Sequence, residues 1–129
     1  MYINLKIDLA ESTSELINNI IKRELRDYFR LNLNVEIIFK WDRYLRSNGI
    51  RLTLNNIISY IINTLEFSIS NGNYVVKINN KLNINEYNPD SLARLINYGN
   101  SEIKGTGIFS DAFKYLDRNI NDIIYREVN

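Results

Sequence analysis

Apolar side chains in this chain recur at two spacings, every second residue in some stretches and every third or fourth residue in others. The first spacing is typical of half-buried strands and the second of amphipathic helices. Residues Tyr2–Leu9 alternate, so we expect a short strand or extended arm over about residues 1–10. Residues Leu31–Phe39 alternate as well and predict a second strand.

Three stretches have the helical spacing. The first runs from Thr13 to about Arg30, and Ser12 with Glu15 three positions later forms a capping box at its start. The second follows Thr53, whose hydroxyl can cap it, and the third begins at Ser110 or Asp111. The apolar faces of the three helices are Leu16, Ile17, Ile20, Ile21, Leu25, Tyr28 and Phe29; Leu54, Ile57, Ile58, Ile61, Ile62 and Leu65; and Phe113, Leu116, Ile120, Ile123 and Ile124.

A β-hairpin is predicted between the second and third of these helices. Asn71-Gly72 lies between Glu66–Ser70 and Asn73–Ile78, two segments rich in β-branched and aromatic residues. Asparagine followed by glycine supplies the two positive-φ positions that a type I′ turn needs. The side chains expected to face the core are Phe67, Ile69, Val76 and Ile78.

A polar loop over Asn79–Asn88 and a short helix over Ser91–Asn97 are expected next. Pro89 suits the opening of this helix and Gly99 its C-cap. The segment that follows contains Gly105 and Gly107 and predicts a flexible connector. The chain as a whole is therefore expected to be one α+β domain, residues 1–129, in which a small antiparallel sheet with a hairpin packs against a long N-terminal helix, a middle helix and a C-terminal helix.

Composition narrows the possible chemistry. The chain has no cysteine and no histidine, which excludes disulfides, thiolate nucleophiles, imidazole bases and zinc sites of the Cys/His kind. Sixteen basic and fifteen acidic side chains give a net charge of +1, which favours no class of partner. We expect no catalytic residues, no metal site and no cofactor, and we do not expect an enzyme.

One short pattern has the letters of a metal-dependent nuclease, Pro89-Asp90 followed by Glu102-Ile-Lys104. In that chemistry two carboxylates hold Mg²⁺ on a rigid sheet and the lysine assists the attacking water. Here Asp90 lies at a helix cap and Glu102 lies in a glycine-flanked loop, so we set this hypothesis aside.

The chain shows no targeting segment. Its first residues lack the charged and apolar regions of a signal peptide, and no apolar run approaches the roughly 20 residues of a membrane helix. We expect a protein made in the cytoplasm that has no membrane partner.

Aromatic and basic residues are interleaved over Trp41–Arg51. The pattern predicts that this segment is a surface loop with a turn at Asn48-Gly49. The sequence leaves a protein interface, core packing and nucleic-acid binding open for Trp41 and Tyr44. We favour the interface, because Trp, Tyr and Arg are the usual hot spots of protein contacts. The basic residues of the first helix are interrupted by Glu24 and Asp27, and we interpret them as a solvated face.

From Leu65 onward the order of features resembles the HK97 gp10-like family of tailed-phage neck and tail-completion proteins. The features are a helix, the hairpin, a variable loop, a short segment ending in Tyr98-Gly99-Asn100, a second loop, the step Phe109-Ser-Asp-Ala112-Phe113, and a terminal helix. Asn100 stands where threonine is commoner in the family, and both prolines usual around the phenylalanine step are missing.

The resemblance implies a structural virion protein of the neck or tail that forms a homo-oligomeric ring between portal or adaptor and tail proteins. Genomic DNA would pass through its channel without sequence-specific binding. A ring needs two different patches that meet between neighbouring copies, and we expect one at Trp41–Arg51 and the other at Tyr98–Gly107. The expected interface residues are Trp41, Arg43, Tyr44, Arg46, Tyr98, Gly99, Glu102 and Lys104.

Two alternatives stay open. A small nucleic-acid-binding protein would use the first helix and Trp41–Arg51, and an adaptor or inhibitor would bind a host protein.

Overall fold

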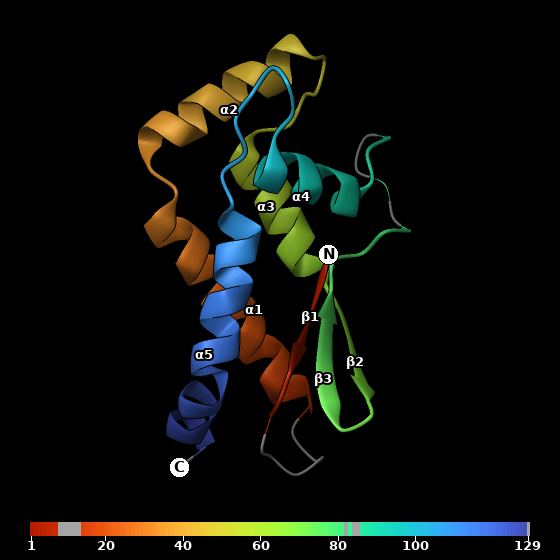
Figure 1. The fold of residues 1–129 in the computed structure, drawn as a ribbon, viewed down its shortest axis with the longest axis vertical. Helices are drawn as coiled ribbons and strands as arrows, with labels where there is room; N and C mark the ends of the chain where they lie inside the picture. The colour runs from red at the N-terminus through yellow and green to blue at the C-terminus, as the bar shows by residue number, and fades with distance from the viewer. Residues whose placement is uncertain (8–13, 82, 84–85, 129) are drawn as a thin grey trace.

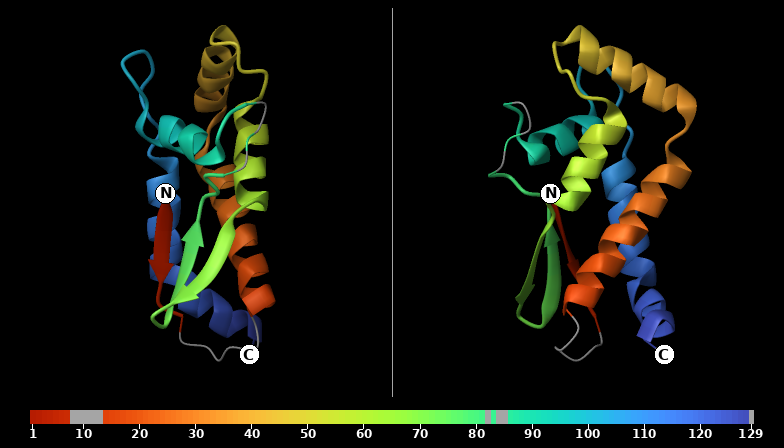
Figure 2. Two further views of the ribbon diagram at one scale, coloured as in Figure 1. Left: turned by 90° about the vertical axis from the view of Figure 1, so that its right-hand side faces the viewer. Right: turned by 180° about the vertical axis from the view of Figure 1, so that it is seen from behind.

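The computed structural model describes residues 1–7, 14–81, 83 and 86–128. Over these residues the chain folds into five helices and a three-stranded antiparallel sheet, which confirms the predicted α+β class. The elements are β1 (Tyr2–Leu5), α1 (Ser14–Asn32), α2 (Val35–Ser47), α3 (Leu54–Asn63), β2 (Glu66–Ser70), β3 (Asn73–Lys77), α4 (Pro89–Tyr98) and α5 (Ile108–Val128). Helices α1 and α5 lie side by side along the molecule, the sheet lies beside them toward one end, and α2 crosses the other end (Figures 1 and 2).

The sheet has the order β1-β3-β2, so the N-terminal strand pairs with the far strand of the hairpin. Asn71 and Gly72 have φ of 51° and 79°, as the predicted type I′ turn requires. The predicted N-terminal strand and hairpin are therefore confirmed, within the residues that the structure describes. Leu9, Ser12 and Thr13, which bear on the arm and on the capping box, lie outside them.

One face of the sheet packs on the helices through Tyr74, Val76 and Ile78, and Phe67 is half-buried. Ile69 was expected on this face in the core, but it is 62% exposed and the expectation is wrong. It lies next to the turn on β2, an edge strand of the sheet. Alternation predicts which face a side chain occupies and not whether another element covers that face.

The helices predicted by spacing are confirmed. Helix α3 is capped by the Thr53 hydroxyl, which accepts from the Asn56 amide. Helix α4 starts at Pro89 and is closed by Gly99, and α5 begins at Ile108, two or three residues before the expected start at Ser110 or Asp111. Most of the predicted apolar positions are buried; of those on α1, Leu16 is exposed and Tyr28 half-buried.

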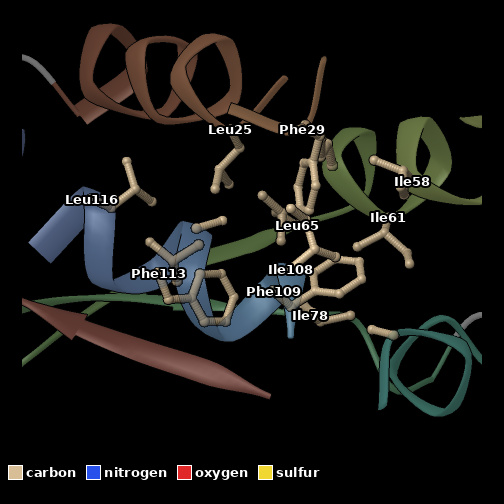
Figure 3. Close-up of a cluster of buried hydrophobic side chains, with 14 of the residues drawn as sticks. Leu25, Phe29, Ile58, Ile61, Leu65, Ile78, Ile108, Phe109, Phe113 and Leu116 are labelled. Carbon is tan, nitrogen blue, oxygen red and sulfur yellow. The ribbon is translucent and has the colours of Figure 1, made fainter. Parts of the chain in front are cut away.

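The core lies where α1, α3 and α5 meet the sheet (Figure 3). The rings of Phe29 on α1 and Phe109 on α5 are 5.0 Å apart between centroids. Leu25 and Leu116 continue this contact along the two helices, and Ile78 closes it from the end of the hairpin.

The strand predicted at Leu31–Phe39 does not form. Helix α1 continues to Asn32, and α2 begins at Val35 after Asn34, whose side chain accepts from the Ile37 amide at 2.8 Å. The alternating positions divide into two series with a spacing of four. The series Leu33, Ile37, Trp41 and Leu45 faces inward, while Leu31, Val35 and Phe39 are exposed. Apolar residues at every second position over nine residues contain both helical series, so the same positions fit a strand and two helical faces equally well.

Candidate interaction site

Most of the segment Trp41–Arg51 lies on a helix, so the prediction of a surface loop there is wrong. Helix α2 runs to Ser47, and the predicted turn follows it, with Gly49 at φ 77°. Trp41 is 1% exposed and packs edge-on against the ring of Tyr44, 5.7 Å away between centroids. Trp41 is therefore a core residue, and its side chain is too deeply buried to touch a partner.

The segment from Tyr98 to Gly107 is fixed by close backbone packing and is not the flexible connector that the glycines suggested. A Cβ on Gly105 would lie 2.3 Å from the carbonyl carbon of Tyr98, and a Cβ on Gly99 would lie 2.3 Å from the Gly105 nitrogen. Gly99 and Lys104 also pair as an antiparallel bridge. Glycine is required at 99 and 105 because the two backbone stretches touch there.

The side chain that organises this segment is Asn97, which the sequence did not single out. It is 4% exposed, and its Oδ1 accepts from the amides of Phe109 and Ser110, at 3.0 Å each. Its Nδ2 donates to the Ser110 hydroxyl at 2.8 Å. Asn97 thus caps α5 from the end of α4, and the cap is invisible in the sequence because it lies 11 residues before α5 begins.

Helix α2 and the 98–107 segment lie at the same end of the molecule (Figures 1 and 2), and their side chains meet there. Asn100 Nδ2 donates to the Tyr44 hydroxyl at 2.7 Å. Between the two elements is a cavity of about 300 Å³ lined by Ile37, Lys40, Trp41, Lys104, Gly105 and Thr106. The two patches expected on separate sides of the subunit therefore form one surface, which we call the head and define as residues 35–53 and 98–107.

The other expected interface residues lie at the surface of the head. Arg43, Arg46, Tyr98, Glu102 and Lys104 are exposed, and Tyr44 and Gly99 are half-buried. The guanidinium of Arg43 lies over the ring of Phe39, 5.1 Å from its centroid.

Three exposed apolar residues are absent from the expected interface because their segment was predicted to be a strand. Leu31 is 75% exposed, Val35 80% and Phe39 60%. Leu31 lies near the end of α1, whereas Val35 and Phe39 lie one turn apart on α2, and Arg43 continues their spacing. The signal that indicates Val35 and Phe39 is this four-residue spacing, once residues 35–47 are recognised as a helix. We call Leu31, Val35 and Phe39 the apolar stripe.

No group of three or more metal-ligating side chains occurs among the described residues. Asp90 is in the first turn of α4 and Glu102 follows its other end, so a helix of about 15 Å separates the two carboxylates of the nuclease pattern. Asp90 instead binds the amino group of Met1 and the Nε of Arg94. Burial raises the pKa of the Asp90 carboxyl, but these two hydrogen bonds outweigh burial and hold the pKa below its ordinary value.

The basic residues of α1 contact residues on several elements. Arg23 pairs with Glu127 of α5 at 2.6 Å, and Arg26 donates to Asn63 of α3 at 2.6 Å. Arg30 makes a longer contact of 3.4 Å with Asp27. Such exposed pairs contribute little stability.

No family model, curated protein or solved structure matches this chain. Among the described helices, none is both long and apolar enough to span a bilayer.

Proposed function

We propose that this chain is a structural virion protein of a tailed bacteriophage, a neck or tail-completion component that forms a homo-oligomeric ring at the head–tail interface of the particle. Its partners are further copies of itself and the portal or adaptor and tail proteins, and it has no catalytic role. The observation that carries the proposal is the apolar stripe at the junction of α1 and α2.

Single exposed apolar residues are ordinary on a protein surface. The stripe is different because its three residues lie within nine positions at the junction of α1 and α2, with Val35 and Phe39 one turn apart on α2, and each is at least 60% exposed. Arg43 stacks on Phe39 and adds a side chain type common at interface hot spots. An aromatic and aliphatic stripe beside arginine is typical of a contact surface.

The order of elements supports the same proposal. After α3 come the hairpin, a loop, α4 ending at Tyr98-Gly99, a second loop and α5 with its Phe109 step, the order that the family resemblance implies. The α+β fold fits that resemblance as well.

The head as one surface changes the ring that we propose. A closed ring needs a heterologous interface, in which one patch meets a different patch on the next copy. The apolar stripe, with Leu31 at the end of α1 and Val35 and Phe39 in the head, supplies one patch, and the second patch lies elsewhere on the subunit.

Light scattering of the purified protein, with and without a portal ring, tests the proposal. We expect a discrete ring, or co-assembly with the portal, for the native chain, and loss of assembly for Val35→Asp. Val35 is the first residue of α2, where an acidic side chain favours the helix, so the variant should stay folded. Ile69→Asp, the same change at an exposed position on the hairpin, is the matched control and should assemble normally.

A monomer that ignores the portal would refute the proposal, as would a Val35→Asp variant that assembles like the native chain. Trp41→Ala is unsuitable for this test because it removes a core side chain.

Nucleic-acid binding is the second candidate, favoured by the basic residues of the head. Its cations are Lys40, Arg43, Arg46, Arg51 and Lys104, against Glu36, Asp42 and Glu102. Asp42 is occupied, because it accepts from the Leu54 amide at 2.7 Å. This candidate predicts binding to duplex DNA that weakens steeply as salt rises and is lost in Arg43→Glu/Arg46→Glu. A gel shift across a salt series separates it from the ring proposal.

A further inference from the structure

A groove of about 320 Å³ opens where α1, α2 and α3 meet. Its lining residues are Arg26, Phe29, Arg30, Leu33, Ile38, Asn55, Ile58, Ser59 and Ile62. The groove is a different surface from the apolar stripe, since none of the three stripe residues lines it.

The floor of the groove is apolar. Phe29 and Leu33 come from α1 and its end, Ile38 from α2, and Ile58 and Ile62 from α3. The volume is at the lower end of the roughly 300–1,000 Å³ usual for binding pockets. A space of this kind is suited to a large apolar side chain.

The rim adds positive charge without a carboxylate among the lining residues. Arg26 and Arg30 lie one helical turn apart on α1, on the rim opposite Asn55 and Ser59 of α3. One nitrogen of Arg26 donates to Asn63 Oδ1 at 2.6 Å, which leaves the other guanidinium donors for a ligand. The Arg30 side chain is 73% exposed, and its contact with Asp27 is 3.4 Å long. Two guanidiniums therefore lie beside an apolar floor.

We propose that this groove binds a segment of a partner protein in which a large apolar side chain is flanked by carboxylates. The apolar side chain would fill the floor, and the carboxylates would pair with Arg26 and Arg30, which suit bidentate recognition. The proposal names the chemistry of a partner within the ring function above and rests on that function for its biological setting. Charge complementarity selects the acidic flanks, and the apolar floor selects a protein over a nucleic acid, whose phosphates gain nothing from it.

Fluorescence polarisation with labelled short peptides tests the assignment on the full chain. The probe is a peptide of alternating glutamate and phenylalanine or leucine; one control peptide has lysine for glutamate, and another has serine for the apolar residues. We expect only the acidic apolar peptide to bind, and Arg26→Glu/Arg30→Glu to weaken it roughly tenfold or more. Ser59→Trp, which fills the groove from its exposed rim and leaves both arginines in place, should also abolish binding.

Arg118→Glu is the matched control, because it reverses an exposed charge on α5 and should leave the affinity unchanged. Circular dichroism of each variant establishes that it is folded.

Three results would overturn the assignment. The first is absence of binding, or equal binding of the lysine peptide. The second is competition between duplex DNA and the peptide, with DNA binding lost in the same variants. This result would make the groove a nucleic-acid site. The third is self-association, measured as an increase in mass, that requires Arg30 and prevents peptide binding. This result would make the occupant a second copy of the chain. Ring mass with the portal is a separate measurement on Val35→Asp, so failure here is distinguishable from failure of the proposed function.

Discussion

Replacing Asn97 by alanine removes the side chain that joins α4, the 98–107 segment and α5. The amides of Phe109 and Ser110 lose their acceptor, and the Ser110 hydroxyl loses a donor. The first of these amides is buried, so water cannot take the place of the lost oxygen there.

The cost follows from these lost contacts. Loss of a side-chain helix cap costs about 0.5–2 kcal/mol, and a buried donor left without an acceptor costs about 1–3 kcal/mol. Because the Ser110 amide is only partly buried, we expect Asn97→Ala to lower the free energy of unfolding by about 2–4 kcal/mol.

Urea unfolding at neutral pH measures this difference as a shift of the midpoint with an unchanged slope. For a domain of this size, the melting temperature should fall by about 3–5 °C for each kcal/mol. Asn97→Asp is the matched control. It keeps an oxygen acceptor for both amides and places negative charge at the N-terminus of α5, so we expect it to retain most of the stability.

A loss below about 1 kcal/mol for Asn97→Ala would refute the reasoning. So would an aspartate variant as unstable as the alanine variant, because the acceptor would then not be what matters. Hydrogen exchange adds a local measure: the amides of Thr106 and Gly107, bonded to the carbonyls of Ile96 and Asn97, should lose protection in Asn97→Ala first.

Two further predictions concern the same end of α4 and the opposite one. Gly105→Ala should destabilise the chain strongly, because the added Cβ meets backbone atoms of Asn97 and Tyr98 at 2.3–2.6 Å. In the control Gly49→Ala the added Cβ meets no atom within 4 Å, so this variant should lose only about 1–2 kcal/mol for the positive φ of Gly49. Urea unfolding of both variants measures the difference. The lowered pKa of Asp90 means that its ion pairs stabilise the fold above the unfolded pKa of about 3.9 and that this stabilisation is lost as pH falls through the folded pKa. The stability difference between the native chain and Asp90→Asn should therefore shrink from pH 7 toward pH 3, and a constant difference would show that the carboxylate charge is not involved.

The elements that the sequence predicted are those with local causes. Helix α1 has buried apolar residues at helical spacing from Ile17 to Phe29, and α3 has Thr53 in the right place for a cap. The hairpin depends on Asn71-Gly72, two adjacent residues with the required backbone preference. Each of these signals lies within a few residues of the structure that it specifies.

The error at α2 arose because one pattern satisfies two structures. Apolar residues at every second position over Leu31–Phe39 fit a strand, and they also fit two interleaved helical series. What decides is Asn34, which caps α2, together with Trp41 and Leu45, which continue the buried series beyond the alternating stretch. A longer window would have favoured the helix, since a strand of fifteen residues is well above the usual length.

The head was not predictable because its contacts join distant parts of the chain. The Tyr44 and Asn100 side chains are 56 positions apart, and the 98–107 segment owes its order to Asn97, whose partners lie beyond the glycines. Glycine-rich sequence suggests freedom when it is considered alone. In this fold Gly99 and Gly105 lie where two backbone stretches touch, so their absence of side chains permits close packing and not mobility.

The separation of the two series on α2 also decides which mutations can report on assembly. Trp41 resembles a hot spot in sequence, yet its replacement by alanine should cost about 3–5 kcal/mol of folding energy and would weaken assembly through the lost stability alone. Val35 and Phe39 belong to the other series, and their side chains are 80% and 60% exposed, so truncating them removes little from the core. If the head is the contact surface, assembly must respond to the exposed series at unchanged stability; a response confined to the buried series would mean that α2 serves the fold alone.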